Sequence, residues 1–183
     1  MQLRLLDVSG CCKLEELPSL ETLTSLEEFH ANNCLKLKRI SGLEQCTKLR
    51  VLNVVRCCEL EELPTMQMLT SLEELHAYDC VKLNSIRGLE QCAKLRKLHV
   101  GRCSELEELP TMQTLTSLEE LHAYDCVKIN SIRGLEQCAK LRYLSVADCS
   151  ELEELPTMQT LTSLEEFRAY NCVKLNSIRG LEQ

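Results

Sequence analysis

The residues best suited to chemistry are four histidines that fall at the same place in a 23-residue period. They are His30, His76, His99 and His122. Glu74 and Glu120 precede two of them by two residues. Imidazole titrates near neutral pH and binds transition metals, so a metal or small-ligand site on this row is one alternative. Because a one-dimensional row does not converge on a tetrahedral centre, we expect no metal site and no cofactor.

Thirteen cysteines follow the same period. One column consists of Cys11, Cys34, Cys57, Cys80, Cys103, Cys126, Cys149 and Cys172, and a second of Cys46, Cys92 and Cys138. Such columns lack the C-x-x-C clusters of metal and redox sites. We expect free thiols that pack as small hydrophobes, the first column also hydrogen-bonding the turn backbone. Unpaired thiols in this number indicate a reducing compartment and predict a cytoplasmic location.

No catalytic constellation accompanies these residues in the sequence. It has no glycine-rich phosphate loop and no serine–histidine–aspartate set, and the Glu107–Glu108 pair and its copies form one solvated rim. The net charge of −7 argues against a nucleic-acid surface. No apolar run approaches the roughly 18 residues of a membrane helix. We therefore expect neither an enzyme nor a nucleic-acid or membrane partner.

The 23-residue period is itself the strongest signal for fold. The coils begin at Leu3, Leu26, Leu49, Leu72, Leu95, Leu118, Leu141 and Leu164, each of which is position 0 of its coil. Positions 3, 5, 8, 11, 14, 17 and 20 are also nearly all apolar. The stretch from Leu118, LEELHAYDCVKINS, fits the L-x-x-L-x-L-x-x-N/C-x-L template of a leucine-rich repeat, with Ala123 at the third leucine and Cys126 at the N/C place.

This pattern predicts an α/β-type repeat solenoid, a curved right-handed leucine-rich-repeat coil with a parallel β-sheet on its concave face. The residues after each first leucine alternate outward and inward as a short strand does, and stacking closes the core. Proline in one coil type and glycine in the other restrict the convex side to short 3₁₀ or extended segments. We expect one domain, 1–183, of eight coils, the last incomplete. Neither end carries a polar capping repeat, which favours a fragment of a longer chain.

Opposite charges alternate along the stack. Position 1 reads Arg4, Glu27, Arg50, Glu73, Arg96, Glu119, Arg142 and Glu165. From Lys36 onward, position 10 alternates between lysine and glutamate in the same way. Like charges on neighbouring strands would repel, so we interpret the alternation as a stacking device that fixes register.

Differences between coils indicate where a partner would bind. Coils 95–117 and 141–163 differ only at Lys97/Tyr143, His99/Ser145, Gly101/Ala147 and Arg102/Asp148, which we place at exposed positions of the strand and its exit. The convex side hardly varies, which favours a varied recognition surface over tolerant drift. Aromatic residues and arginine are the usual anchors of binding. The predicted contact residues are Tyr78, Asp79, His99, Arg102, Tyr124, Asp125, Tyr143, Asp148, Arg168 and Tyr170.

Two sequence motifs carry a resemblance to a known protein family. They are CCELEELP, residues 57–64, and CSELEELP, residues 103–110, each followed by a T-S-L-E-E-L join. The chain resembles the leucine-rich-repeat region of plant intracellular nucleotide-binding disease-resistance proteins of the TIR type. The resemblance implies plant defence signalling, recognition of a pathogen effector or a guarded host protein, and a nucleotide-binding domain in cis. The chain departs from that family in having no nucleotide-binding motif and no TIR region. A stand-alone scaffold or adaptor outside immunity is the alternative.

Overall fold

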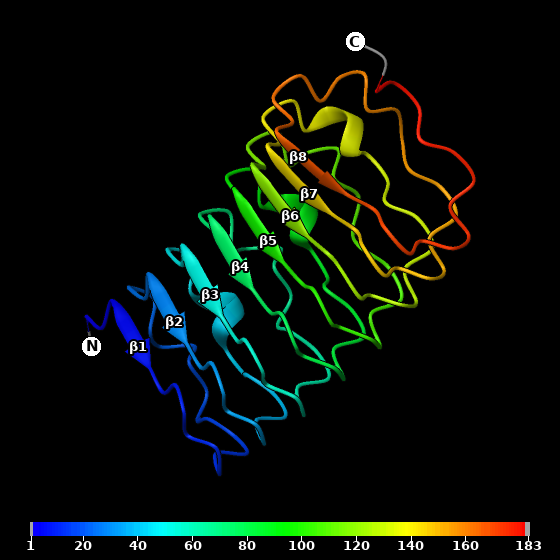
Figure 1. Ribbon diagram of the computed structural model, residues 1–183. Helices are drawn as coiled ribbons and strands as arrows, with labels where there is room; N and C mark the ends of the chain where they lie inside the picture. The colour runs from blue at the N-terminus through cyan, green and yellow to red at the C-terminus, as the bar shows by residue number, and fades with distance from the viewer. Residues whose placement is uncertain (1, 182–183) are drawn as a thin grey trace.

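The computed structural model describes residues 2–181 and shows one parallel sheet built from three-residue strands (Figure 1). The strands are β1 Leu5–Asp7, β2 Glu28–His30, β3 Val51–Asn53, β4 Glu74–His76, β5 Lys97–His99, β6 Glu120–His122, β7 Tyr143–Ser145 and β8 Glu166–Arg168. They lie in the sheet in chain order, and each pairs with the strand 23 residues further on, so that His99 lies opposite His122. Met1 lies outside the described residues, and so do Glu182 and Gln183, the last residues of the incomplete eighth coil that the sequence predicts.

The strands form because their side chains alternate between core and solvent. Leu98, the middle residue of β5, is fully buried, whereas Lys97 and His99 on either side of it are half-buried on the opposite face. The next residues after each strand turn the chain out of the sheet. Arg102 and Asp125 at position 7 have φ angles of 62° and 56°. Asparagine, aspartate and glycine tolerate this left-handed region better than other residues, which explains their frequency at position 7.

The core is a set of apolar columns that run along the stack. In the sixth coil Leu118, Leu121, Ala123 and Cys126 are fully buried. The same positions in the first and last coils are only partly covered, and Leu181 is 52% exposed. Each coil therefore depends on its two neighbours for burial, as a solenoid requires.

The cysteine column at position 8 contributes hydrogen bonds as well as volume. The Sγ of Cys103 donates to the carbonyl oxygen of Ala77 at 3.1 Å, and the Sγ of Cys126 donates to that of Val100 at the same distance. The Sγ of Cys149 repeats the contact with Ala123 at 3.0 Å. The predicted thiol-to-backbone bonds are confirmed in this column.

The side opposite the sheet carries three 3₁₀ turns, η1 Leu43–Gln45, η2 Leu89–Gln91 and η3 Leu135–Gln137. Gly134 precedes η3 with a φ of 79°, and a Cβ atom there would lie 2.5 Å from the backbone nitrogen of Gln113. Residues 2–181 contain no α-helix, and none of their helices is long and apolar enough to cross a membrane. The predicted parallel-β solenoid with short 3₁₀ and extended segments is confirmed.

Candidate functional site

The solvent side of the sheet, which we call the sheet face, is formed by positions 2 and 4 of the strands and position 6 just beyond them (Figure 1). Its C-terminal half contains a hollow of about 570 Å³. The lining residues are Glu120, His122, Tyr124, Tyr143, Leu144, Ser145, Glu166, Arg168 and Tyr170. Four predicted contact residues, Tyr124, Tyr143, Arg168 and Tyr170, are therefore brought together here.

The remaining predicted residues lie outside this hollow. Arg102 joins two of them, because its Nη1 is 4.0 Å from the Oδ1 of Asp79 and its Nε 3.7 Å from the Oδ2 of Asp125. Asp148 accepts a hydrogen bond from the Nδ2 of Asn171 at 2.8 Å. These charged side chains form a row at the strand exits, and half-buried Tyr78 lies just before Asp79.

The structure corrects one part of the sequence interpretation. Gly101, Ala147 and Ser145 were expected at exposed positions, but all three are buried. The ring of Tyr124 covers Gly101 so closely that a Cβ atom there would lie 2.6 Å from its Cε1. Ala147 occupies the same place one unit later, and the following tyrosine, Tyr170, is 59% exposed. Gly101 thus lies beneath a neighbouring ring, and the Gly101/Ala147 difference is not a change of exposed contact group.

Three imidazole rings stack across β4, β5 and β6. The ring centroids of His76 and His99 are 4.8 Å apart and those of His99 and His122 are 4.5 Å apart, both edge to face. The Nδ1 atoms of His76 and His99 lie 3.1 Å apart. The fourth histidine, His30, stands separately on β2, with its Nε2 3.3 Å from the Oε2 of Glu28.

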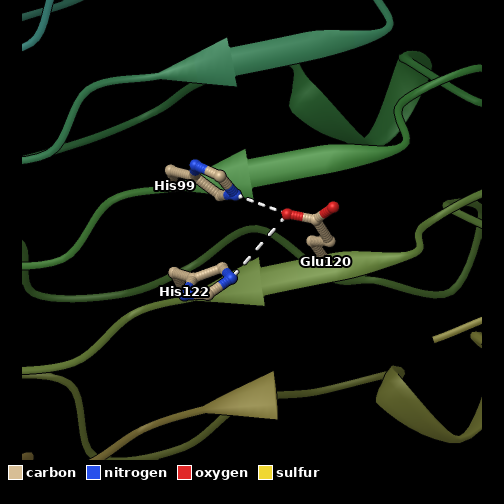
Figure 2. Close-up of side chains that lie close together, drawn as sticks. All are labelled: His99, Glu120 and His122. Atoms are coloured by element: carbon tan, nitrogen blue, oxygen red, sulfur yellow. Dashed lines mark hydrogen bonds and ion pairs between the residues drawn. The ribbon is translucent and has the colours of Figure 1, made fainter. Parts of the chain in front are cut away.

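Glu120 of β6 lies beside imidazoles on both β5 and β6. Its Oε2 lies 3.2 Å from the Nε2 of His99 and 3.8 Å from the Nε2 of His122 (Figure 2). One ligand atom from each of the three residues lies within 4.8 Å of the others. The expectation of no metal site rested on the straight histidine row, and Glu120 adds a carboxylate beside two of its imidazoles, because position 2 of β6 faces the same side as position 4 of β5 and β6.

Burial lowers the pKa of two of these imidazoles, His99 and His122. The pKa of His99 is lowered to about 4, first by burial and then by the neighbouring charges of His122 and His76, against the raising effect of Glu120. Burial also lowers the pKa of His122, again opposed by Glu120. Neutral imidazole is the form that binds metal ions.

Tyrosine and arginine give the hollow both apolar and charged groups. The guanidinium carbon of Arg142 lies 5.6 Å from the ring centroid of Tyr143, within the range of a cation–π contact. The hydroxyl of Tyr143 donates to the Oε2 of Glu165 at 3.3 Å. Burial raises the pKa of Tyr124. Glu166 also lines the hollow and was missed from the sequence, although its place at position 2 puts it on the same face.

The comparisons identify the repeat type. A family model described as BspA type leucine rich repeat region matches residues 8–100 and 78–182 in six copies. No curated protein matches the chain.

Two solved structures have similar folds. The leucine-rich repeat domain of the type III effector XopL aligns with a TM-score of 0.65 at 18% identity, over 85% of this chain and 57% of that one. The leucine-rich effector YopM from Yersinia pestis aligns with a TM-score of 0.62 at 24% identity, over 92% of this chain and 49% of that one. The chain thus spans about half the length of the structures it matches, and the likeness shows the fold.

Proposed function

The chain belongs to the BspA-type leucine-rich-repeat family, and we propose that its sheet face is a protein-recognition surface. Repeat domains of this kind commonly bind proteins along an extended sheet. The observation that supports this function most directly is the hollow, where Tyr124, Tyr143 and Tyr170 surround Arg168. Tyrosine and arginine are enriched among the residues that dominate binding energy.

The distribution of side chains supports this face over the opposite one. The tyrosines at 78, 124, 143 and 170 are all of the tyrosines in the chain, and each lies on a strand or at its exit. On the opposite side the ELEELP motif recurs in every second coil, at 59–64, 105–110 and 151–156. A protein partner would therefore find distinct groups only on the sheet face.

We propose a binding module without catalysis of its own, in keeping with a repeat fold that is generally non-catalytic. Neither nucleic acid nor membrane is part of this function, because the net charge is −7 and the hollow contains two glutamates, Glu120 and Glu166. The free thiols favour a reducing, cytoplasmic location.

The narrower proposal is that this surface is the sensing segment of a plant-type intracellular immune receptor, which binds a pathogen effector or a guarded host protein. Its support is the pair of phrases at 57–64 and 103–110. The family match does not extend to this level, and a scaffold or adaptor outside immunity is the alternative. Sequencing the transcript on both sides of these codons separates them. An upstream phosphate-binding loop supports the receptor, and a bare repeat array supports the adaptor.

A selection experiment tests the recognition surface. The purified chain would be used to select binders from a displayed library of protein fragments, without any bias toward one face. Each binder would then be titrated against a triple variant of the hollow, Tyr143→Ala with Arg168→Ala and Tyr170→Ala. The control carries three substitutions on the opposite side, Glu107→Ala with Glu108→Ala and Gln113→Ala.

We expect most binders to lose at least about 2 kcal/mol of binding free energy with the hollow variant, which is the usual cost of replacing a residue that dominates binding. The control should bind as the unmodified chain does. Equal binding by the hollow variant, or selective loss with the control, would overturn the assignment of the sheet face. Thermal melting of both variants checks that each remains folded.

A further inference from the structure

Four side chains form a continuous line of short contacts across β4, β5 and β6. The Oε2 of Glu74 lies 2.9 Å from the Nε2 of His76, whose Nδ1 lies 3.1 Å from the Nδ1 of His99. The Nε2 of His99 then lies 3.2 Å from the Oε2 of Glu120. Each of these three contacts needs a hydrogen between its two heavy atoms, because every atom in the line otherwise presents a lone pair.

These three contacts have one proton, and therefore one positive charge, too few. A neutral imidazole carries one N–H and an ionised carboxylate carries none, so two hydrogens serve three contacts. Placed on the two shorter contacts, they let His76 donate to Glu74 and His99 donate to the Nδ1 of His76. The unprotonated Nε2 of His99 then faces the Oε2 of Glu120. A cation at this place would be held from both sides.

Lys97, on the same strand as His99, has its Nζ 3.4 Å from the Oε1 of Glu74, so it neutralises the other end of the line. The carboxylate of Glu120, beside the Nε2 of His99, is therefore the end of the line that a cation would neutralise.

We propose that a divalent transition-metal ion of the zinc class binds here, held by the Nε2 atoms of His99 and His122 and the Oε2 of Glu120 (Figure 2). Tetrahedral zinc with bonds of about 2.0–2.1 Å sets its ligand atoms roughly 3.3 Å apart. The distances from Glu120 to the two imidazoles, 3.2 and 3.8 Å, lie close to that separation. Two imidazoles with one carboxylate match the ligands zinc prefers, whereas magnesium and calcium prefer all-oxygen sites.

The surroundings supply what such a site needs. A ligating imidazole usually donates its other N–H to a fixed acceptor, and His76, itself held by Glu74, provides one for His99. The ligand side chains are 26%, 27% and 35% exposed for His99, Glu120 and His122, so an ion can reach them. Three protein ligands leave a fourth position open. Glu120 and His122 also line the hollow, so water, or a group from whatever occupies the hollow, would complete the coordination.

Calorimetric titration of the chain with zinc alone tests the site, and no protein partner is involved, so the result is independent of the recognition function. The chain is first stripped with chelator and kept reduced. Cys11→Ser with Cys12→Ser is the background, because these two adjacent thiols are exposed and could bind zinc themselves. Two variants remove ligands, His99→Ser and Glu120→Gln. Ser145 already occupies the position of His99 on β7, so the serine suits the fold.

We expect one zinc ion to bind per chain in the background variant. Replacing either ligand should lower the zinc affinity by more than the roughly 10–100-fold that is typical when a supporting residue is replaced. His76→Leu should weaken binding within that 10–100-fold range, since it removes only the acceptor for His99. His30→Ser is the matched control and should leave the affinity unchanged. Cobalt bound in place of zinc should give the absorption of a tetrahedral centre without a thiolate charge-transfer band.

The site would be overturned by the absence of zinc binding to the background variant, by zinc affinities of His99→Ser and Glu120→Gln equal to that of the background variant, or by a thiolate band in the cobalt spectrum. Loss of affinity in His30→Ser equal to that in His99→Ser would also contradict it, because the ion would then not be confined to β5 and β6.

Discussion

Arg96 donates two hydrogen bonds to Glu119 on the next coil, from Nε to Oε1 at 3.0 Å and from Nη2 to Oε2 at 2.9 Å. The same two-point contact joins Arg4 to Glu27, Arg50 to Glu73 and Arg142 to Glu165. At position 10 of the same two coils, the Nζ of Lys128 pairs with Glu105. The ion pairs at these positions thus join each proline-containing coil to the coil that follows it into a 46-residue unit, whereas Lys97 with Glu74 and Arg102 with Asp79 link one such unit to the next.

Reversing one charge should weaken this unit. Arg96→Glu would lose the contact with Glu119 and place three carboxylates on neighbouring strands, so we expect a lower melting temperature. The double reversal, Arg96→Glu with Glu119→Arg, should recover part of the loss. Both effects should shrink in high salt, because these groups are exposed and salt screens them. Differential scanning fluorimetry at low and high salt measures this, and an unchanged single variant would mean that the pairs contribute no stability.

The same pairs predict how stability depends on acid. The hydrogen bond from Arg96 holds the pKa of Glu119 below its usual value of 4.5 in the folded chain. The unfolded chain therefore binds the proton first, and this contribution is present above about pH 4.5 and lost as the pH falls through the lower folded value. We expect the difference in melting temperature between the unmodified chain and Glu119→Gln to narrow below about pH 4.5. A constant difference from neutral to acidic pH would contradict the linkage.

The period of 23 residues was enough to predict the sheet, the core columns and the 3₁₀ turns, because the spacing of the apolar positions sets which side chains face the core. It was not enough to predict which neighbour a side chain contacts. The alternation at position 1 allows Glu119 to pair with Arg96 or with Arg142, and only the side-chain rotamers decide. The reach of Glu120 across to His99 likewise depends on its rotamer, so the sequence placed Glu120 near the histidines without showing which imidazole it contacts.

Gly101→Ala should displace the ring of Tyr124. The added Cβ would lie 2.6 Å from the Cε1 of that ring, so the ring must move away from position 101. We expect a rise in the solvent accessibility of Tyr124, measured by site-resolved hydroxyl-radical labelling. Overpacking of this kind costs about 1–3 kcal/mol of unfolding free energy where the neighbouring side chain cannot move. A smaller loss would indicate that the Tyr124 ring has moved to another rotamer. Ala147→Gly is the reciprocal control and should allow Tyr170 to pack more closely.

The thiols should fall into two reactivity classes. Burial raises the pKa of Cys126 to about 12 and that of Cys138 likewise, so almost no thiolate forms near neutral pH. Cys11 and Cys12 are exposed and should react first with iodoacetamide, as followed by peptide mass spectrometry. Denaturant should make the buried thiols reactive together. Rapid labelling of Cys126 in the folded chain would mean that its column is not the packed core described above.

Leu109 and Leu17 occupy the same position of two coils but differ in their neighbours. Leu109 is 7% exposed between two complete coils, whereas Leu17 in the first coil is only partly buried. Leu109→Ala should cost about 2–5 kcal/mol of unfolding free energy, since the rigid columns on both sides cannot collapse into the cavity. Leu17→Ala should cost clearly less, because one side of that residue lacks a covering coil. Urea unfolding followed by circular dichroism measures both, and similar losses would show that burial is not shared between neighbouring coils.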